Sequence, residues 1–421
     1  TPSAAPWAPR PLLPARAGRP APPSGAAMGP WEKLPVVECR GAAPSEIGRS
    51  HGEQLRTRID ATLDFYFGRF AALGVGSDGL RSWGDACRSE VGAFAPELAE
   101  EIAGIAEGAG RQAWELFALN ARSELLAAAL RAAGRAAPGE CTSAYCAASA
   151  WLGQNWDWDA RMDSLLVLLR IPACQGRPQI LTVTEPGMVG KIGFNDCGVG
   201  VCLNFLAAPG PPAGAPAGVP VHCLLRLALG CRTLRDADAQ VRAAPRGTTC
   251  HILLADAIGQ FRMLELAGDA LESAASDPLS ANVGVEEPIE GSEWQVVQAS
   301  AVVHTNHYLH PRFAALSQEN LAHSRERYAR ATQLVDDFDG APGVGHGADA
   351  HLELMKRILG DRSGAPRSIL YDGAPGVFGD GAPLGTICSV IMDLRSLCAH
   401  VTRGSAMRQE YARVPLRASA L

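Results

Sequence analysis

Two short apolar runs, around Cys141 and around Asp157, constrain the fold of this chain most strongly. The first run covers Cys141–Tyr145 and the second covers Gly153–Trp158, and the residues Ala148–Ala150 between them are typical of a turn. Both runs are short enough and apolar enough for strands, so we expect an antiparallel hairpin. Such a hairpin would bring the Asp157 carboxylate back towards the Cys141 thiol.

The same cysteine divides the chain into two parts of different periodicity. Before it, apolar residues recur at helical spacing, and Ser45 is the expected N-cap of the first helix. After it, strand-like runs predominate and later alternate with helical segments, the clearest of which are 221–229, 234–243, 311–338 and 350–359. A strand is also expected at 296–306. Strands grouped between helical segments favour an α+β fold, a sheet sandwich covered by helices on both sides.

Composition limits the classes of partner. The chain of 421 residues has a net charge of −6 and no long block of Lys or Arg, which argues against nucleic acid. No apolar run is long enough to span a bilayer. The twelve cysteines include no CxxC pair, which favours free thiols and a cytoplasmic location.

The first 33 residues differ from the rest. They are rich in Pro, Ala and Arg and contain no acidic residue before Glu32. We interpret them as a disordered N-terminal arm, with Met28 as an alternative start of the protein.

Several motifs together resemble one family. These motifs are Ser45–Glu53, Glu101–Gly110, Leu119–Glu124, the cysteine hairpin, His304–His307 and Thr386–Asp393. They are similar to the acyl-coenzyme A:6-aminopenicillanic acid acyltransferase family (peptidase family C45), whose members are N-terminal nucleophile (Ntn) hydrolases. The resemblance implies a four-layer αββα sandwich and a precursor that cuts itself before Cys141. Residues 34–140 would then be a mainly helical α chain and 141–421 the β chain, together forming one unit.

The resemblance also assigns the catalytic residues. Cys141 would be the nucleophile, with its own freed α-amine as base, and Asp157 would hold that amine or the thiol in place. Asn306 and Asn204 match asparagines that donate hydrogen bonds to the oxyanion of the tetrahedral intermediate. Family members often carry glycine just before the cysteine, whereas this chain has Glu140, a departure that bears on the rate of self-cleavage.

Three further residues concern the substrate. Gln154 stands where choloylglycine hydrolases carry arginine and the acyltransferase branch carries glutamine, which favours the latter. Arg327, followed by Arg330, resembles an arginine-bearing helix that shapes the pocket in relatives, although a solvated helix face is the alternative. Tyr145, beside the nucleophile, is a candidate substrate-binding residue.

The expected function is hydrolysis or acyl transfer on small N-acyl amides. The substrate would be a small acyl compound such as acyl-coenzyme A, an N-acyl amino compound, a β-lactam precursor or a β-alanyl amide. No cofactor is expected. No metal is expected either, because the histidines at 304, 307 and 310 would lie on alternate faces of a strand. Two alternatives remain: a non-catalytic Ntn scaffold that binds such a ligand, and a cysteine protease with a histidine base, for which no histidine motif is apparent.

Overall fold

The computed structural model describes residues 33–135, 141–206, 218–245, 247–267, 280–282, 300–310, 313, 322–341, 347–365, 368–371, 374–375, 383–404 and 410–417. Residues 1–32 of the expected arm, Glu140 and much of the expected loops lie outside these ranges. Among the helices in these ranges, none combines the length and the apolar character that a membrane span requires.

Helices form the first layer of the described structure, as the periodicity before Cys141 predicts. They are α1 (Pro44–Ala72), α2 (Ser77–Phe94), α3 (Pro96–Ala109), α4 (Ala113–Asn120) and α5 (Arg122–Ala132). The expected N-cap at Ser45 is wrong, because α1 already begins at Pro44 and is capped by Ala43. A proline fits the first helical position, since its fixed φ suits a helix and its missing N–H would have no partner there.

Helices α1 and α3 lie against each other with their backbones in close contact. A Cβ placed on Gly48 of α1 would lie 2.0 Å from the carbonyl oxygen of Glu101, and one on Gly104 of α3 would lie 2.2 Å from that of Ser45. Gly52 and Gly108 make the same kind of approach one turn further along. Glycines spaced four apart on both helices therefore create the surface at which the two helices meet.

We expect Gly104→Ala to lower the free energy of unfolding by about 1–3 kcal/mol, because the new methyl group must push the two helices apart. The control is Gly68→Ala, within the partner helix α1, where an added Cβ meets nothing within 4 Å. That change should be neutral or stabilising by up to about 1 kcal/mol, as expected for alanine in a helix. Urea unfolding of both variants measures the difference. Equal midpoints for the two variants would contradict the close approach.

The second layer is an eight-stranded sheet, which we name sheet A. Its strands, in spatial order, are β1 (Val36–Glu38), β4 (Val167–Ile171), β5 (Ile180–Thr184), β6 (Ile192–Asn195), β7 (Gly200–Phe205), β8 (Thr249–Ala255), β9 (Phe261–Ala267) and β10 (Ser280–Asn282). Strand β1 runs parallel to β4, and the other neighbours are antiparallel. The helical first segment of the chain therefore contributes an edge strand to this sheet.

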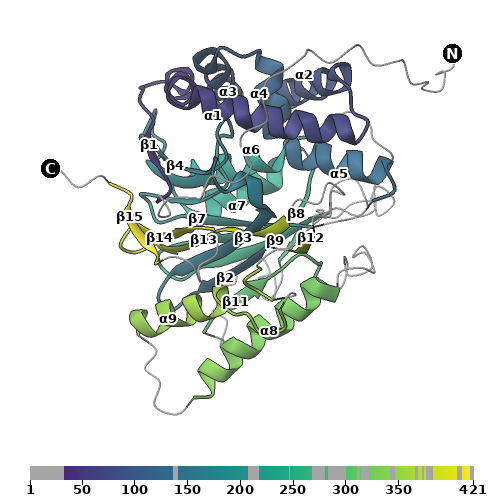
Figure 1. Ribbon diagram of the computed structural model, residues 1–421. Helices are drawn as coiled ribbons and strands as arrows, with labels where there is room; N and C mark the ends of the chain where they lie inside the picture. The colour runs from purple at the N-terminus through teal and green to yellow at the C-terminus, as the bar shows by residue number, and fades with distance from the viewer. Residues whose placement is uncertain are drawn as a thin grey trace. The chain divides into compact units, whose positions relative to one another are not determined.

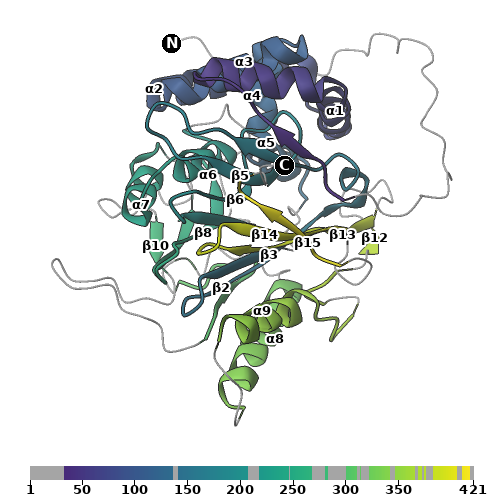
Figure 2. The same cartoon turned by 90° about the vertical axis from the view of Figure 1, so that its left-hand side faces the viewer.

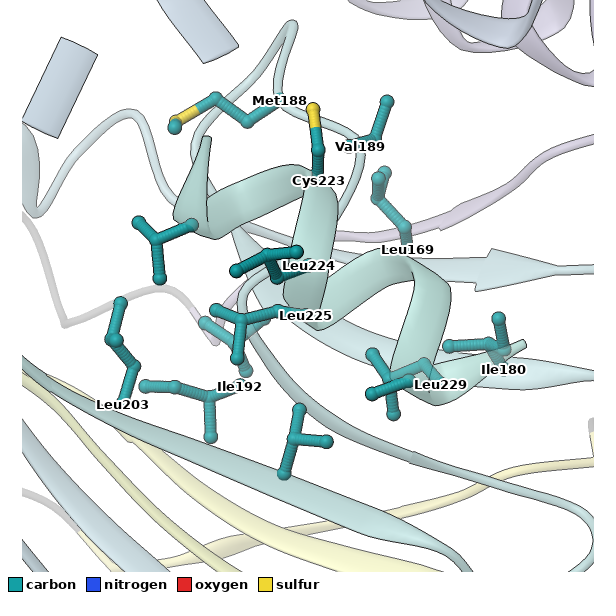
Figure 3. Close-up of a cluster of buried hydrophobic side chains, with 14 of the residues drawn as sticks. Leu169, Ile180, Met188, Val189, Ile192, Leu203, Cys223, Leu224, Leu225 and Leu229 are labelled. Carbon is teal, nitrogen blue, oxygen red and sulfur yellow. The ribbon is translucent and has the colours of Figure 1, made fainter. Parts of the chain in front are cut away.

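Helices α6 (Val221–Leu229) and α7 (Leu234–Ala243) have the bounds that the sequence predicts. Figure 3 shows how Leu225 and Leu229 of α6 point towards Ile180 and Ile192 of sheet A. All four side chains are fully buried. This apolar contact holds α6 against the face of sheet A that the helical layer covers.

The third layer, sheet B, contains the predicted cysteine hairpin. In spatial order its strands are β11 (Val302–His304), β2 (Thr142–Cys146), β3 (Trp151–Asp159), β13 (Pro383–Asp393), β14 (Cys398–Arg403) and β15 (Ala412–Pro415), and β12 (Ala374–Pro375) pairs with β13. Strands β2 and β3 are antiparallel with Thr142 opposite Asn155, which confirms the hairpin. Its turn ends at Ala150, whose φ of 59° is left-handed.

Helices α8 (Ala322–Asp339) and α9 (Ala348–Leu359) form the fourth layer, against the outer face of sheet B (Figure 1). Cys146 of β2 is buried in the apolar cluster that these helices make with the sheet. Figure 2, turned by 90°, shows the same order of helices, two sheets and helices. The expected αββα architecture is therefore confirmed. The helix expected at 311–338 begins later among the described residues, and the strand expected at 296–306 is described only as β11.

Candidate active site

Cys141 lies directly before β2, at the start of a strand in the middle of the molecule. Its side chain is only 9% exposed. Its carbonyl oxygen accepts two hydrogen bonds, one from Nδ2 of Asn204 at 3.1 Å and one from Nη1 of Arg327 at 2.7 Å. Because one donor comes from sheet A and the other from α8, the backbone at the cysteine is fixed from both sides.

Asp157 of β3 lies beside this cysteine, as the hairpin predicts. Its carboxylate accepts a hydrogen bond of 2.6 Å from the hydroxyl of Thr386, and the residue is 2% exposed. Burial raises the pKa of the Cys141 thiol, and the negative charge of Asp157 raises it further. The ammonium of Lys191, the backbone amide of Asp157 and the guanidinium of Arg327 act in the opposite direction on this pKa. The uncut chain therefore holds the cysteine mainly as a thiol.

Asn204 of β7 reaches across from sheet A, and its amide is held in one orientation. The oxygen Oδ1 accepts from the hydroxyl of Ser143 at 2.6 Å and lies 2.9 Å from Nδ1 of His251. Since Nδ2 donates to the Cys141 carbonyl, Oδ1 is the acceptor and His251 donates to it. Two donors on one side of the amide thus keep its N–H groups directed at the cysteine.

Asn306 is connected to Cys141 through Arg327. Its Oδ1 accepts from Nη2 of Arg327 at 2.9 Å, and its Nδ2 donates to the carbonyl oxygen of Phe205 at 2.9 Å. Arg327 also donates to the hydroxyl of Thr142 at 2.9 Å and is only 1% exposed. The alternative of a solvated helix face is therefore wrong for Arg327.

The neighbouring residues of Asn306 belong to other contacts. His304 places Nε2 at 2.9 Å from Glu265 and stacks on the ring of His251 with 3.5 Å between centroids. His307 places Nδ1 at 2.8 Å from the hydroxyl of Ser324. Within the described ranges, no cluster of His, Cys, Asp or Glu side chains could hold a metal ion.

Two other predicted residues connect the sheets. Tyr145 is fully buried, and its hydroxyl donates to the carbonyl oxygen of Asp256 at 2.7 Å. Gln154 bridges the backbone of Leu203, donating to its carbonyl oxygen at 2.5 Å and accepting from its amide at 2.8 Å. Gln154 therefore joins β3 of sheet B to β7 of sheet A. Tyr145 makes its contact within the buried core.

A pocket lies next to Cys141 and Asp157. Most of its wall is apolar. The described residues that line it are Arg122, Ser123, Leu126, Ala127, Cys141, Trp156, Asp157, Trp158, Lys191, Leu203, Phe205, Val221, Cys250 and Leu384. The segments come from α5, both sheets and α6, so the pocket lies between the helical layer and the two sheets.

Two cations of this wall, Lys191 and Arg122, were not predicted from the sequence. Arg122 opens α5 and forms a buried ion pair of 2.7 Å with Glu185. Lys191 is the one charged residue in the apolar run 188–194, which leads into β6. A single charge inside an apolar run was the available signal in the sequence. Arg122 lies within the family-like motif Leu119–Glu124, but nothing in the motif gave it a role.

A double-sheet sandwich between helical layers, with a pocket-lining cysteine at the start of an inner strand, has the architecture of the Ntn hydrolase class. The sequence profile of the family "Acyl-coenzyme A:6-aminopenicillanic acid acyl-transferase" matches residues 145–407. An acyl-coenzyme A:6-aminopenicillanic-acid-acyltransferase 40 kDa form from Emericella nidulans is 31% identical over an alignment of 383 residues, which covers 88% of this chain and 91% of the relative. The chain therefore belongs to the acyl-coenzyme A:6-aminopenicillanic acid acyltransferase family.

Solved structures with partial similarity include two amide hydrolases. A conjugated bile acid hydrolase from Clostridium perfringens is 11% identical with a TM-score of 0.38, covering 65% of this chain and 92% of its own. An N-acylethanolamine-hydrolyzing acid amidase ortholog from Caenorhabditis elegans is 14% identical with a TM-score of 0.38, covering 65% of this chain and 99% of its own.

Proposed function

We propose that this chain is a self-processing amide hydrolase or acyltransferase that acts on small N-acyl amides through a thioester on Cys141. The observation that carries the proposal is the position of Cys141, which lines a largely apolar pocket together with Asp157 while Asn204 and Arg327 fix its carbonyl. A nucleophile held in this way needs only a base and an oxyanion donor to attack an acyl carbon.

The first reaction would be cleavage of the chain itself. The Sγ of Cys141 attacks the carbonyl carbon of Glu140, the peptide C–N bond breaks, and the departing nitrogen takes a proton to become the α-amine of Cys141. Water then hydrolyses the thioester and releases Glu140 as a new carboxyl end. The products would be an α chain that ends at Glu140 and a β chain that begins at Cys141.

The freed α-amine supplies the base that the uncut chain lacks. Its ordinary pKa is close to 8, so it can take the thiol proton at neutral pH. Asp157 would hold the α-ammonium formed in this step. The thiolate attacks the acyl donor, and the oxyanion that forms would be stabilised by Asn204 and Asn306, each worth about 3 kcal/mol. The amine or thiol of the donor then leaves, and water or a second amine takes the acyl group.

The pocket suggests the kind of substrate. Its apolar wall suits a small acyl group, and the donor would be an acyl-coenzyme A or an N-acyl amino compound such as a β-lactam precursor or a β-alanyl amide. All twelve cysteines are free thiols, which supports the cytoplasm as the location. The alternative is a scaffold that binds such a compound without cutting itself.

The experiment that tests the proposal is trapping of the acyl-enzyme. Purified protein is mixed with acyl-coenzyme A thioesters and N-acylglycines of two to ten carbons, quenched in acid and measured as intact chains. We expect a chain that starts at Cys141 and carries the mass of the acyl group on this residue. Added amine should divert the acyl group from hydrolysis to transfer. An uncut chain that binds these compounds but never carries the acyl group would favour the non-catalytic scaffold instead.

A further inference from the structure

Lys191 is a buried cation of the pocket wall, and no carboxylate among the described residues forms an ion pair with it. The residue is 4% exposed, and its Nζ lies 3.3 Å from the centroid of the Trp156 ring. Among the residues that the structure describes, no carboxylate or other acceptor hydrogen-bonds this ammonium. The face of an indole offsets part of the loss of hydration, but a buried ammonium is stable only with a compensating negative charge.

Arg122 lies on the same wall, and its charge is already balanced. Its Nη2 pairs with Glu185 at 2.7 Å, and its guanidinium lies 4.8 Å from the ring centroid of Trp158 and 5.0 Å from that of Tyr66. Its Nε is buried and has no acceptor among the described residues. Arg122 therefore adds to the positive field around Lys191.

The remaining charge of the pocket wall is Asp157. Its carboxylate accepts from Thr386 and acts on the Cys141 thiol, whose pKa it raises. In the processed chain of the proposed function, the new α-ammonium of Cys141 would neutralise Asp157. Lys191 would then be the unbalanced charge of the site.

The electrostatics of Lys191 favour an anionic ligand at its Nζ. Burial lowers the pKa of its ammonium well below the usual value, the positive charge of Arg122 lowers it further, and Glu185 opposes this only in part. A carboxylate bound at Nζ would favour the charged form and offset the cost of burial.

From this arrangement we infer that Lys191, supported by Arg122, is a carboxylate-binding subsite for the substrate. The inference rests on the proposed function and narrows its substrate class. The apolar wall, which includes Phe205, Val221 and Leu384, would hold the acyl chain. A compound that satisfies both parts of the wall is an N-acyl amino acid, whereas a neutral N-acyl amide leaves Lys191 without a partner.

The test compares two substrates that differ only in charge, N-hexanoylglycine and N-hexanoylglycinamide. With the wild-type enzyme we expect kcat/KM to be roughly 10- to 100-fold higher for the carboxylate, the range of a hydrogen bond to a charged group. Lys191→Met should remove this preference, mainly through KM for N-hexanoylglycine. Because Lys191 also lowers the pKa of the Cys141 thiol, the readout is the ratio of kcat/KM for the two compounds and not either value alone. The control is Lys356→Met on α9, where the lysine pairs with Glu353 at the surface and the preference should remain.

Binding of both compounds to the wild-type protein is measured by calorimetry alongside turnover. An equal loss for both substrates in Lys191→Met would overturn the inference, because the lysine would then serve the Cys141 thiolate or the fold. Equal binding and equal turnover of the two compounds by the wild type would also overturn it, and this comparison needs no variant to mature. If the wild type binds the carboxylate selectively but turns over neither compound, the subsite stands and the proposed function fails.

Discussion

Cys141→Ala is expected to remain a single uncut chain without activity. The side chain supplies both the group that would attack the Glu140 carbonyl and the nucleophile for substrate, so its removal blocks two successive reactions. Loss of a nucleophile of this kind lowers turnover by at least about 10⁴-fold. Intact mass measurement and N-terminal sequencing show whether the chain stays uncut. The rate of amide hydrolysis shows whether activity is lost.

The chain offers a matched control in Cys146, on the same strand. This thiol is fully buried on the outer face of sheet B, in the cluster with α8 and α9. Cys146→Ala should cost about 1 kcal/mol of stability through a small cavity and leave cleavage and activity intact. A cut before residue 141 in the Cys141→Ala chain would refute self-processing, since some other agent would then be responsible.

Arg327→Met should produce the next largest effect, on cleavage, activity and stability together. The guanidinium donates to the carbonyl of Cys141, the hydroxyl of Thr142 and the amide oxygen of Asn306. Methionine keeps most of the volume but leaves these buried acceptors without their charged donor, which typically costs 3 to 5 kcal/mol, as an order-of-magnitude figure. The carbonyl oxygen of Cys141 would keep only one of its two hydrogen bonds, the one from Asn204.

Two further variants separate the geometry of Arg327 from its charge. Arg327→Lys keeps a positive charge but cannot make the forked contacts, so we expect a loss close to that of methionine. Arg325→Met, on an exposed position of the same helix, should leave the time course of cleavage and the urea midpoint unchanged. If Arg327→Lys behaves like the wild type, a positive charge alone is sufficient for cleavage and stability, and the paired hydrogen bonds of the guanidinium have no role.

Local periodicity predicted much of the fold. Helices α6 and α7 have the predicted bounds, and the hairpin of β2 and β3 is present, because their apolar spacing agrees with the faces that are buried. The N-cap at Ser45 was wrong because Pro44 can open a helix one residue earlier. Capping depends on local backbone geometry, which the residue type does not fix by itself.

Part of the candidate site followed from the sequence as well. Cys141 and Asp157 are close in the chain and lie on the two strands of one hairpin, so their proximity needs only local structure. Asn204 reaches the Cys141 carbonyl from another sheet, and the resemblance of its motif, rather than any spacing, pointed to it. Tyr145 was expected at the substrate, yet its hydroxyl is bound to the Asp256 carbonyl in the core.

The sequence by itself therefore determined the αββα layers, the hairpin at the cysteine and the family. Only the tertiary structure decided the charge of the pocket. Glu185 and Lys191 lie in the connection between β5 and β6, whereas Arg122 opens α5, and nothing in the sequence marks this arginine as their neighbour. Whether a cation is solvated, paired or left without a partner depends on which groups surround it in space, because the cost of burying charge is set by its surroundings and not by its residue type.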